Sequence, residues 1–196
     1  MIILDKNDLI NKFNNFENKI KDNTFQQNKG LGNDVGYYIF DYPTEYEEYI
    51  RIRVKKIKDK INDNNYPFKI QEFDIYNIVF DIIKEKNYLE KIFQLEEKRG
   101  TKKTLQAIQS MLKLGTDNNL ISKKILEEYD KNTVIFITGI GKIYPIVRAH
   151  DILNNLDITE VPLVLFYPGK YTGTDLKLFN EIEDTNYYRA LSFEKI

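Results

Sequence analysis

The C-terminal part of the sequence contains three short apolar runs, Val134-Ile-Phe-Ile137, Val161-Pro-Leu-Val-Leu-Phe166 and Tyr187-Tyr-Arg-Ala-Leu-Ser-Phe193. A buried strand typically reads as about four to eight apolar, β-branched or aromatic residues that end at a turn. The first two runs lead into turns rich in glycine or proline, Thr138-Gly-Ile-Gly-Lys142 and Tyr167-Pro-Gly-Lys170. Each run therefore predicts a β-strand.

The segment between the first two runs has the pattern of a helix. Apolar residues recur at helical spacing from Ile146 to Leu156, and Pro145 stands near the first turn, where proline is tolerated. Strand, helix and strand at this spacing form a βαβ unit, whose strands are parallel and whose crossover is right-handed. We therefore expect a parallel sheet.

The N-terminal half of the sequence predicts two more strands and two helices. Residues 35–41 and 68–73 read as strands, the second with the alternation of a half-buried strand. Residues 8–20 form an amphipathic helix with one apolar face. A second helix begins at a capping box that opens with Thr44 and continues to Ile61.

Residues 74–132 read as a long run of helices, interrupted at Arg99-Gly100-Thr101 and at Gly115. The predicted fold is thus a three-layer α/β domain over residues 1–196. It has a mostly parallel five-stranded sheet, helices on both faces and a helical insertion between the second and third strands. The order of elements is analogous to degenerate relatives of the P-loop NTPases, an analogy that concerns the fold alone.

The composition excludes several classes of function but does not indicate a particular one. The 196 residues include 42% hydrophobic and 30% charged residues, as in ordinary soluble globular proteins. The 29 basic and 30 acidic residues give a net charge of −1, so we expect no global attraction to nucleic acid or to anionic membrane. The sequence has no cysteine and a single histidine, His150, which excludes disulfides, thiolate metal sites and multi-histidine metal sites.

The sequence predicts a cytoplasmic protein without a membrane anchor. No apolar run approaches the roughly 18 residues of a transmembrane helix. The first residues, Met-Ile-Ile-Leu-Asp-Lys, lack the basic and then apolar pattern of a signal peptide.

Several segments resemble a known family when they are taken in order. They are Phe136-Ile-Thr-Gly-Ile-Gly-Lys-Ile-Tyr-Pro145, Arg148-Ala-His150, Val161-Pro-Leu-Val-Leu-Phe-Tyr-Pro-Gly169 and Asn186-Tyr-Tyr-Arg-Ala190. They resemble the C-terminal signature of BrxB, a component of bacterial BREX phage-exclusion systems, and Phe40-Asp-Tyr-Pro43 fits the first strand and turn of that family.

The resemblance implies a biological role more firmly than a chemistry. BrxB proteins have no assigned enzymatic activity or cofactor. They accompany an ATPase, a DNA methyltransferase and PglZ, a protein of the alkaline phosphatase superfamily. The resemblance therefore implies a non-catalytic protein that assembles with other BREX proteins, with a PglZ-like protein as the favoured partner and with an indirect association with DNA.

The alternative of a nucleotide-binding domain depends on a phosphate-binding loop. A P-loop requires glycines, a lysine and a Ser or Thr after a strand, but Asp41-Tyr-Pro-Thr-Glu-Tyr-Glu47 has no glycine or lysine. Gly139-Ile-Gly-Lys142 is the nearest glycine-rich turn, and Ile143 stands where Ser or Thr is needed. This turn is either a strand-to-helix connection with positive φ or an anion-binding nest.

Four cationic residues, Lys142, Arg148, Lys170 and Arg189, lie near predicted strand ends. Ligands of open α/β sheets bind at the carboxyl ends of the strands, so Lys142 and Lys170 could converge on one site. Arg189 could instead pair with an aspartate, either Asp41 or Asp184. The alternative for all four is that they are solvated charges or members of structural ion pairs.

His150 has two interpretations. It could act as a general base beside Asp151 or Arg148, but adjacent residues of a helix do not face each other. No serine or cysteine pairs with it in the sequence to form a triad. The alternative is a partly buried histidine that is hydrogen-bonded to a loop at a strand end.

Two surfaces are expected to bind partners. The first is the loop from Tyr167 to Gly173, whose aromatic residues Tyr167 and Tyr171, with Tyr187 and Tyr188, form an exposed patch unless they belong to the core. The second is part of residues 90–130, because the insertion is longer than a crossover requires.

Two alternatives to this second surface remain open. The insertion could complete the core, so that the N-terminal helix 6–20 docks instead. The insertion also carries a mixed charge run, Glu96-Glu-Lys-Arg99 followed by Lys102-Lys103. Its basic residues could contact DNA phosphates, or the run could be a solvated face.

Overall fold

The computed structural model describes residues 5–27, 36–184 and 190–193. A parallel sheet lies at the centre, in the order β2-β3-β4-β1-β7, and two further strands, β5 and β6, extend it in antiparallel fashion from β4. The parallel strands are β1 (Tyr37–Tyr42), β2 (Lys69–Asp74), β3 (Thr133–Thr138), β4 (Leu163–Tyr171) and β7 (Leu191–Ser192). The parallel βαβ unit predicted from the sequence is confirmed, because β3 and β4 are adjacent and parallel.

The apolar runs form the sheet because their side chains point alternately to its two faces. In β1, Ile39 belongs to the core on one face and Phe40 to the core on the other. The same division separates Ile135 from Phe136 in β3 and Leu165 from Phe166 in β4. Strands that are buried on both faces read as continuous apolar runs, which is why the sequence predicted them.

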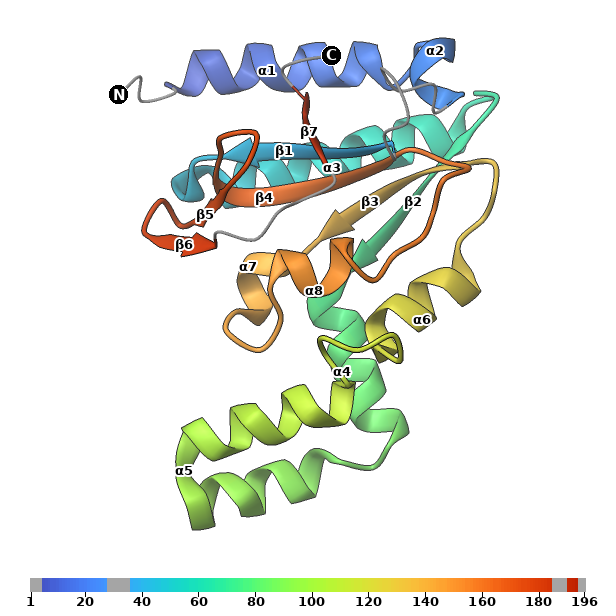
Figure 1. Ribbon diagram of the computed structural model, residues 1–196. Helices are drawn as coiled ribbons and strands as arrows, with labels where there is room; N and C mark the ends of the chain where they lie inside the picture. The colour runs from blue at the N-terminus through green and yellow to red at the C-terminus, as the bar shows by residue number, and fades with distance from the viewer. Residues whose placement is uncertain (1–4, 28–35, 185–189, 194–196) are drawn as a thin grey trace.

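The first layer of helices covers the sheet face that carries Phe40 (Figure 1). It consists of α1 (Lys6–Lys19), the short α2 (Asn23–Gln26), the 3-10 turn η1 (Thr44–Tyr46) and α3 (Glu47–Asp63). The side chain of Phe16 lies at its centre, with ring centroids of Phe40, Phe166 and Phe193 at 4.9–5.5 Å. Lys60 of α3 donates a hydrogen bond to Glu17 of α1 and lowers the pKa of that carboxyl group below its ordinary value.

The second layer of helices covers the opposite face, so the three-layer α/β architecture is confirmed. It consists of α4 (Ile75–Glu85), α5 (Leu89–Leu112), α6 (Leu120–Glu128), α7 (Ile140–Ile143) and α8 (Ala149–Leu153). The first three of these helices form the predicted insertion between β2 and β3.

Helix α5 is folded back on itself at Gly100, where the sequence predicted a break. Gly100 has φ 73° and ψ 169°, a conformation that essentially only glycine adopts. Figure 1 shows the two arms of α5 side by side as a hairpin, beyond α4 and away from the sheet. The insertion therefore contains helices that cover the sheet, α4 and α6, and a hairpin that projects from them.

The single helix predicted from Pro145 to Leu156 is wrong. Within that range only α8 is helical, over Ala149–Leu153, whereas α7 ends at Ile143, before the proline. The peptide bond between Tyr144 and Pro145 is cis. The residue before a proline disfavours the helical region, and Tyr144 is extended with φ −60° and ψ 139°. Helix α8 then begins anew after Arg148, whose backbone N–H donates to Asp151 Oδ2 at 2.8 Å.

The turn predicted from Tyr167 to Lys170 is also wrong, because β4 continues to Tyr171. Two strands missed in the sequence, β5 (Leu176–Leu178) and β6 (Ile182–Asp184), pair with this extension. Gly169 allows the close approach, since a Cβ at this position would lie 2.1 Å from the Lys177 carbonyl oxygen. The predicted last strand is described only over Leu191–Ser192 of β7, and residues 187–189 lie outside the described ranges.

Candidate functional site

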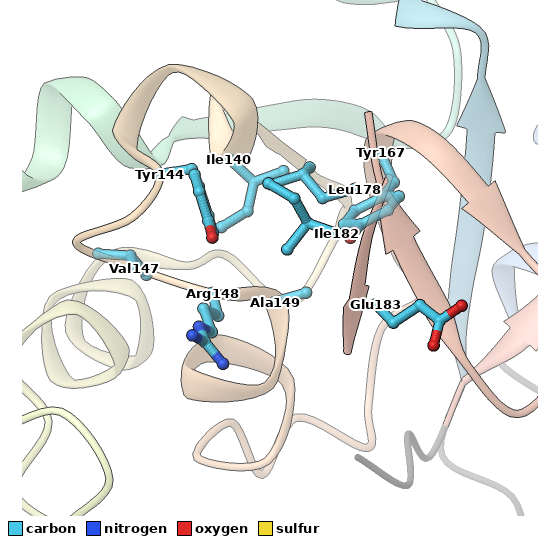
Figure 2. Close-up of a pocket in the computed structure, with 9 residues that line it drawn as sticks. All are labelled: Ile140, Tyr144, Val147, Arg148, Ala149, Tyr167, Leu178, Ile182 and Glu183. Carbon is cyan, nitrogen blue, oxygen red and sulfur yellow. The ribbon is translucent and has the colours of Figure 1, made fainter. Parts of the chain in front are cut away.

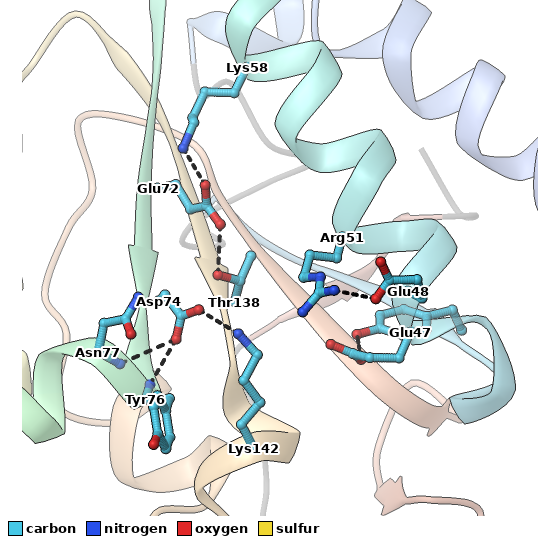
Figure 3. A network of polar contacts seen from close by, with 11 residues as sticks. Glu47, Glu48, Arg51, Lys58, Glu72, Asp74, Tyr76, Asn77, Thr138 and Lys142 are labelled. Atoms are coloured by element: carbon cyan, nitrogen blue, oxygen red, sulfur yellow. Dashed lines mark hydrogen bonds and ion pairs between the residues drawn. The ribbon is translucent and has the colours of Figure 1, made fainter.

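A network of polar side chains joins the carboxyl ends of β2 and β3 (Figure 3). Glu72 of β2 accepts a hydrogen bond from Thr138 of β3 at 3.0 Å and pairs with Lys58 of α3. Lys142 Nζ lies 2.7 Å from Asp74 Oδ2 at the end of β2. Both carboxylates are therefore already held by partners from other elements.

The glycine-rich turn after β3 fits closely around Asp74. Gly139 has φ 78°, and a Cβ at this position would lie 2.2 Å from Asp74 Oδ1. That same oxygen accepts hydrogen bonds from the backbone N–H groups of Tyr76 and Asn77, at 3.0 and 3.3 Å, and so caps α4. The interpretation of this turn as a connection with positive φ is confirmed, and the anion that lies beside it is a carboxylate of the protein itself.

A groove of about 410 Å³ runs between α3 and these strand ends. Its charges have both signs and pair largely with one another, as Arg51 does with Glu48 in Figure 3. At one end Tyr42 donates to Glu47 at 2.6 Å, and burial raises the pKa of Tyr42 well above its usual value. In the described part of the chain, no cluster of three or more His, Asp or Glu side chains could hold a metal ion.

Lys142 and Lys170, which the sequence placed at neighbouring strand ends, have different neighbours. Lys142 pairs with Asp74 and lines the groove beside α3. Lys170 is exposed and stands opposite Lys177 in the β4–β5 ladder, where Lys177 pairs with Glu183 at 2.9 Å. The expected convergence on one anion site therefore has no support in these contacts.

Arg148 and His150 lie in a second, polar hollow. It measures about 600 Å³ and is bordered by α5 and the start of α8, including Gln106, Gln109 and Ser110. Arg148 also lines a smaller, mostly apolar pocket against β4–β6, together with Tyr167 (Figure 2).

His150 is partly buried, as one of its two interpretations predicted, but the argument against Asp151 as its neighbour is wrong. His150 Nε2 lies 3.3 Å from Asp151 Oδ1, and the His150 side chain is 27% exposed. The Asp151 carboxylate turns back to cap the first turn of α8, which brings it beside the adjacent residue. An Asp that caps a short helix can therefore reach its neighbour, unlike a residue in mid-helix.

The expected aromatic patch around Tyr167 and Tyr171 is wrong, because these side chains are only 2% and 6% exposed. The extension of β4 and the β5–β6 hairpin enclose them in the core. Tyr171 Oη donates to the carbonyl oxygen of Ala190 at 2.7 Å. The other proposed members, Tyr187 and Tyr188, and the candidate Arg189 lie outside the described residues.

Comparisons with known proteins agree on a family. The family model described as BREX protein BrxB matches residues 71–193. A protein of Bacillus cereus (strain H3081.97) named BREX protein BrxB is 44% identical over 174 residues, 88% of this chain and 90% of that protein. The chain belongs to the BrxB family. A BrxB protein of Escherichia coli O9:H4 (strain HS) is 28% identical over 181 residues, 91% of this chain and 88% of the relative. No solved structure matches.

The segments that carried the resemblance to BrxB lie mainly around the second layer of helices. They form β3 with α7, the start of α8, and most of β4. Among the described helices of this BrxB chain, none combines the length and the apolar character that a membrane crossing requires.

Sequence reasoning missed the most buried ion pair of the BrxB fold described here. Lys12 Nζ of α1 lies 2.6 Å from Asp41 Oδ1 of β1, and each residue is only 9% exposed. The other carboxylate oxygen of Asp41 accepts the backbone N–H of Tyr171 at 2.9 Å. The available signal was a lysine on the apolar face of the predicted helix and an aspartate in an apolar strand.

Proposed function

We propose that this BrxB protein is a non-catalytic component of a BREX anti-phage system and works by assembling with other BREX proteins. A PglZ-like protein is the favoured partner, and the association with DNA through such partners is indirect. The observation that carries the proposal is the match to BREX protein BrxB over 88% of the chain. It is supported by the groove at the strand ends, whose carboxylates Glu72 and Asp74 are held by the protein's own cations.

The docking surface that we propose is the outer side of the α5 hairpin. The sheet is already covered by α4 and α6, which bury Ile78, Ile82 and Ile125. Helix α5 contributes Ile92, Ile108 and Leu112 to that core, yet its Phe93 is 61% exposed. Exposed aromatic side chains are enriched among the residues that anchor protein interfaces.

Replacement of Phe93 tests this surface. Phe93→Ser should weaken binding of the PglZ-like protein by about 10- to 30-fold, the loss of about 2 kcal/mol that is typical of an aromatic anchor. The measurement is co-purification from the native operon, followed by titration of the two purified proteins. The midpoint of thermal unfolding should stay unchanged because Phe93 is exposed.

Ile52→Ser is the matched control, since Ile52 is an apolar side chain of α3 that is 44% exposed. It should bind the partner normally. In cells, deletion of the gene should abolish both phage exclusion and host-DNA methylation by the system. Normal phage exclusion in the deletion strain would contradict the proposed role in the BREX system. Unchanged binding of the PglZ-like protein by Phe93→Ser would contradict only the proposed docking surface.

A nucleotide-binding domain is the second candidate, and the groove of about 410 Å³ at the carboxyl ends of the strands favours it. Thermal unfolding with ATP or GTP and Mg²⁺ separates the two functions. An increase of several degrees that is lost in Lys142→Ala would support nucleotide binding, and no increase would leave assembly as the function.

A further inference from the structure

The turn of the α5 hairpin carries four cationic side chains within six residues. They are Lys98 and Arg99 at the end of the first arm and Lys102 and Lys103 at the start of the second, and we call them the basic tip. All four are exposed. Within the described ranges of the chain, none of their charged groups has an ion-pair or hydrogen-bond partner, whereas Lys58 and Lys142 at the groove are both paired.

Two acidic residues precede the basic tip and do not neutralise it. Glu96 Oε1 accepts a hydrogen bond from Thr101 Oγ1 at 3.1 Å, which ties this carboxylate across the turn. Glu97 adds a second negative charge, so residues 96–103 have four positive and two negative charges. The turn therefore has a local excess of positive charge on a chain whose net charge is −1.

The position of the basic tip makes it accessible to a large ligand. Figure 1 shows the hairpin beyond α4, with its turn at the end of the two arms that is remote from α4. A Cβ placed on Gly100 would meet no atom within 4 Å, so the turn is open around its centre. A rigid polyanion could approach it without contact with the rest of the fold.

The composition of the basic tip favours phosphate over a protein surface. Lysine is depleted in the cores of protein interfaces, which use aromatic and other apolar anchors. Three of the four cations are lysines, and Phe93, the exposed aromatic of α5, lies more than one helical turn before Lys98. Lysine and arginine without such an anchor are the side chains that contact nucleic-acid phosphates independently of sequence.

We propose that the basic tip of the α5 hairpin contacts the phosphate backbone of double-stranded nucleic acid directly. This goes beyond the indirect association with DNA in the proposed function and does not depend on it. The contact needs no particular base sequence, because the tip offers only flexible cations. Because the contact is ionic, its affinity should fall as the salt concentration rises.

The test measures binding of the full chain to a fluorescent duplex of arbitrary sequence by anisotropy over a range of salt concentrations. Four phosphate contacts predict a slope of about −3.6 for the logarithm of affinity against the logarithm of salt concentration. The double variant Lys102→Ala/Lys103→Ala should reduce the slope to about −1.8, since each lost contact removes about 0.9. A duplex DNA and a duplex RNA of the same sequence identify the natural source of the phosphates.

The matched control is Lys55→Ala/Lys56→Ala, which removes two adjacent, exposed lysines from α3. It changes the net charge equally and should leave the slope unchanged. The proposal is overturned by absence of duplex binding at low salt, or by equal slopes for both double variants. It is also overturned if the tip variant loses a BREX partner and keeps its affinity for both duplexes, because the tip then binds an acidic protein surface.

Discussion

At the scale of single residues, the ion pair between Lys12 and Asp41 joins α1 to β1, only 29 residues further along the chain. Lys12 Nζ donates to the side chain and to the backbone carbonyl oxygen of Asp41, at 2.6 and 2.7 Å. Asp41 in turn holds the backbone of Tyr171. A buried pair of this kind adds little net stability over apolar residues, but the loss of one partner leaves the other charge buried.

Lys12→Met should therefore lower the free energy of unfolding by about 3–5 kcal/mol, the usual cost of an unpaired buried charge. The double variant Lys12→Met/Asp41→Asn should cost less than the sum of the single changes. The comparison comes from urea denaturation of the wild type, Lys12→Met, Asp41→Asn and the double variant. Lys60→Met is the control, because Lys60 pairs with Glu17 while its side chain is 54% exposed, and it should cost at most about 1 kcal/mol. If Lys12→Met and Lys60→Met lower the free energy of unfolding equally, burial of the Lys12–Asp41 pair does not set the cost of losing one partner.

The sequence predicted which residues lie near the strand ends, but it did not predict which side chains these residues contact. The order of the strands in the sheet brings Lys142 to Asp74, which are 68 residues apart in the sequence. Tyr167 was expected at the surface because proline and glycine follow it, but Gly169 admits β5 beside β4. A local pattern specifies where a turn is possible, whereas tertiary pairing decides whether it forms.

At the scale of elements, the α5 hairpin depends on Gly100. Its φ and ψ lie in a region that residues with a side chain rarely adopt. A Cβ at this position would meet no atom within 4 Å outside the local helix backbone. The cost of a substitution is therefore one of backbone conformation alone. Gly100→Ala should lower the free energy of unfolding by about 1–3 kcal/mol or straighten α5 into one helix.

Urea denaturation and circular dichroism together distinguish these two results of Gly100→Ala. In a straightened α5 the pairs Lys98–Lys102 and Arg99–Lys103 would be i,i+4 neighbours on one helix face. Duplex binding should therefore persist with either result. Ser110→Ala, on the exposed side of the second arm, is the control and should change stability by less than about 0.5 kcal/mol. Wild-type stability together with wild-type helix content in Gly100→Ala would contradict the role of this glycine.

The elements that the sequence predicted correctly are those with a strong local pattern. Strands β1, β2, β3 and β4 were predicted close to their starts. Three of them, β1, β3 and β4, read as apolar runs, and β2 shows the alternation of a half-buried strand. Strands β5 and β6 were missed, since each is three residues long and includes charged residues such as Lys177 and Glu183. The helix expected over 145–156 was too long because its apolar spacing began before the extended Arg148, after which α8 covers only Ala149–Leu153.

At the scale of the whole molecule, the two outer layers cover the sheet in different ways. The layer of α1 and α3 lies over Phe40 and Phe166 of the sheet and completes the core. The other layer completes the core through α4 and α6 and presents α5 beyond them. The sequence predicted the three layers, because strands alternated with helices, but it left open whether α1 or the insertion docks.

Two deletions test what each of these layers contributes to folding and to binding. Helix α1 and its C-cap residue completely bury four apolar side chains, Leu9, Phe13, Phe16 and Ile20. Burial of such a side chain contributes about 1.5–3 kcal/mol, so the four together contribute about 6–12 kcal/mol. This is similar to the whole stability of a typical domain, about 5–15 kcal/mol. A protein that lacks residues 1–22 should therefore fail to fold.

A protein whose residues 95–104 are replaced by a short glycine-containing turn should instead keep its fold, because Ile92, Ile108 and Leu112 still reach the core. It should unfold cooperatively, as circular dichroism during heating will show, but lose the basic tip and with it duplex binding. Partner binding should weaken if the interface extends from Phe93 toward the turn. If the protein without residues 1–22 folds and loses only its BREX partner, then α1 is the docking element and the α5 hairpin is not.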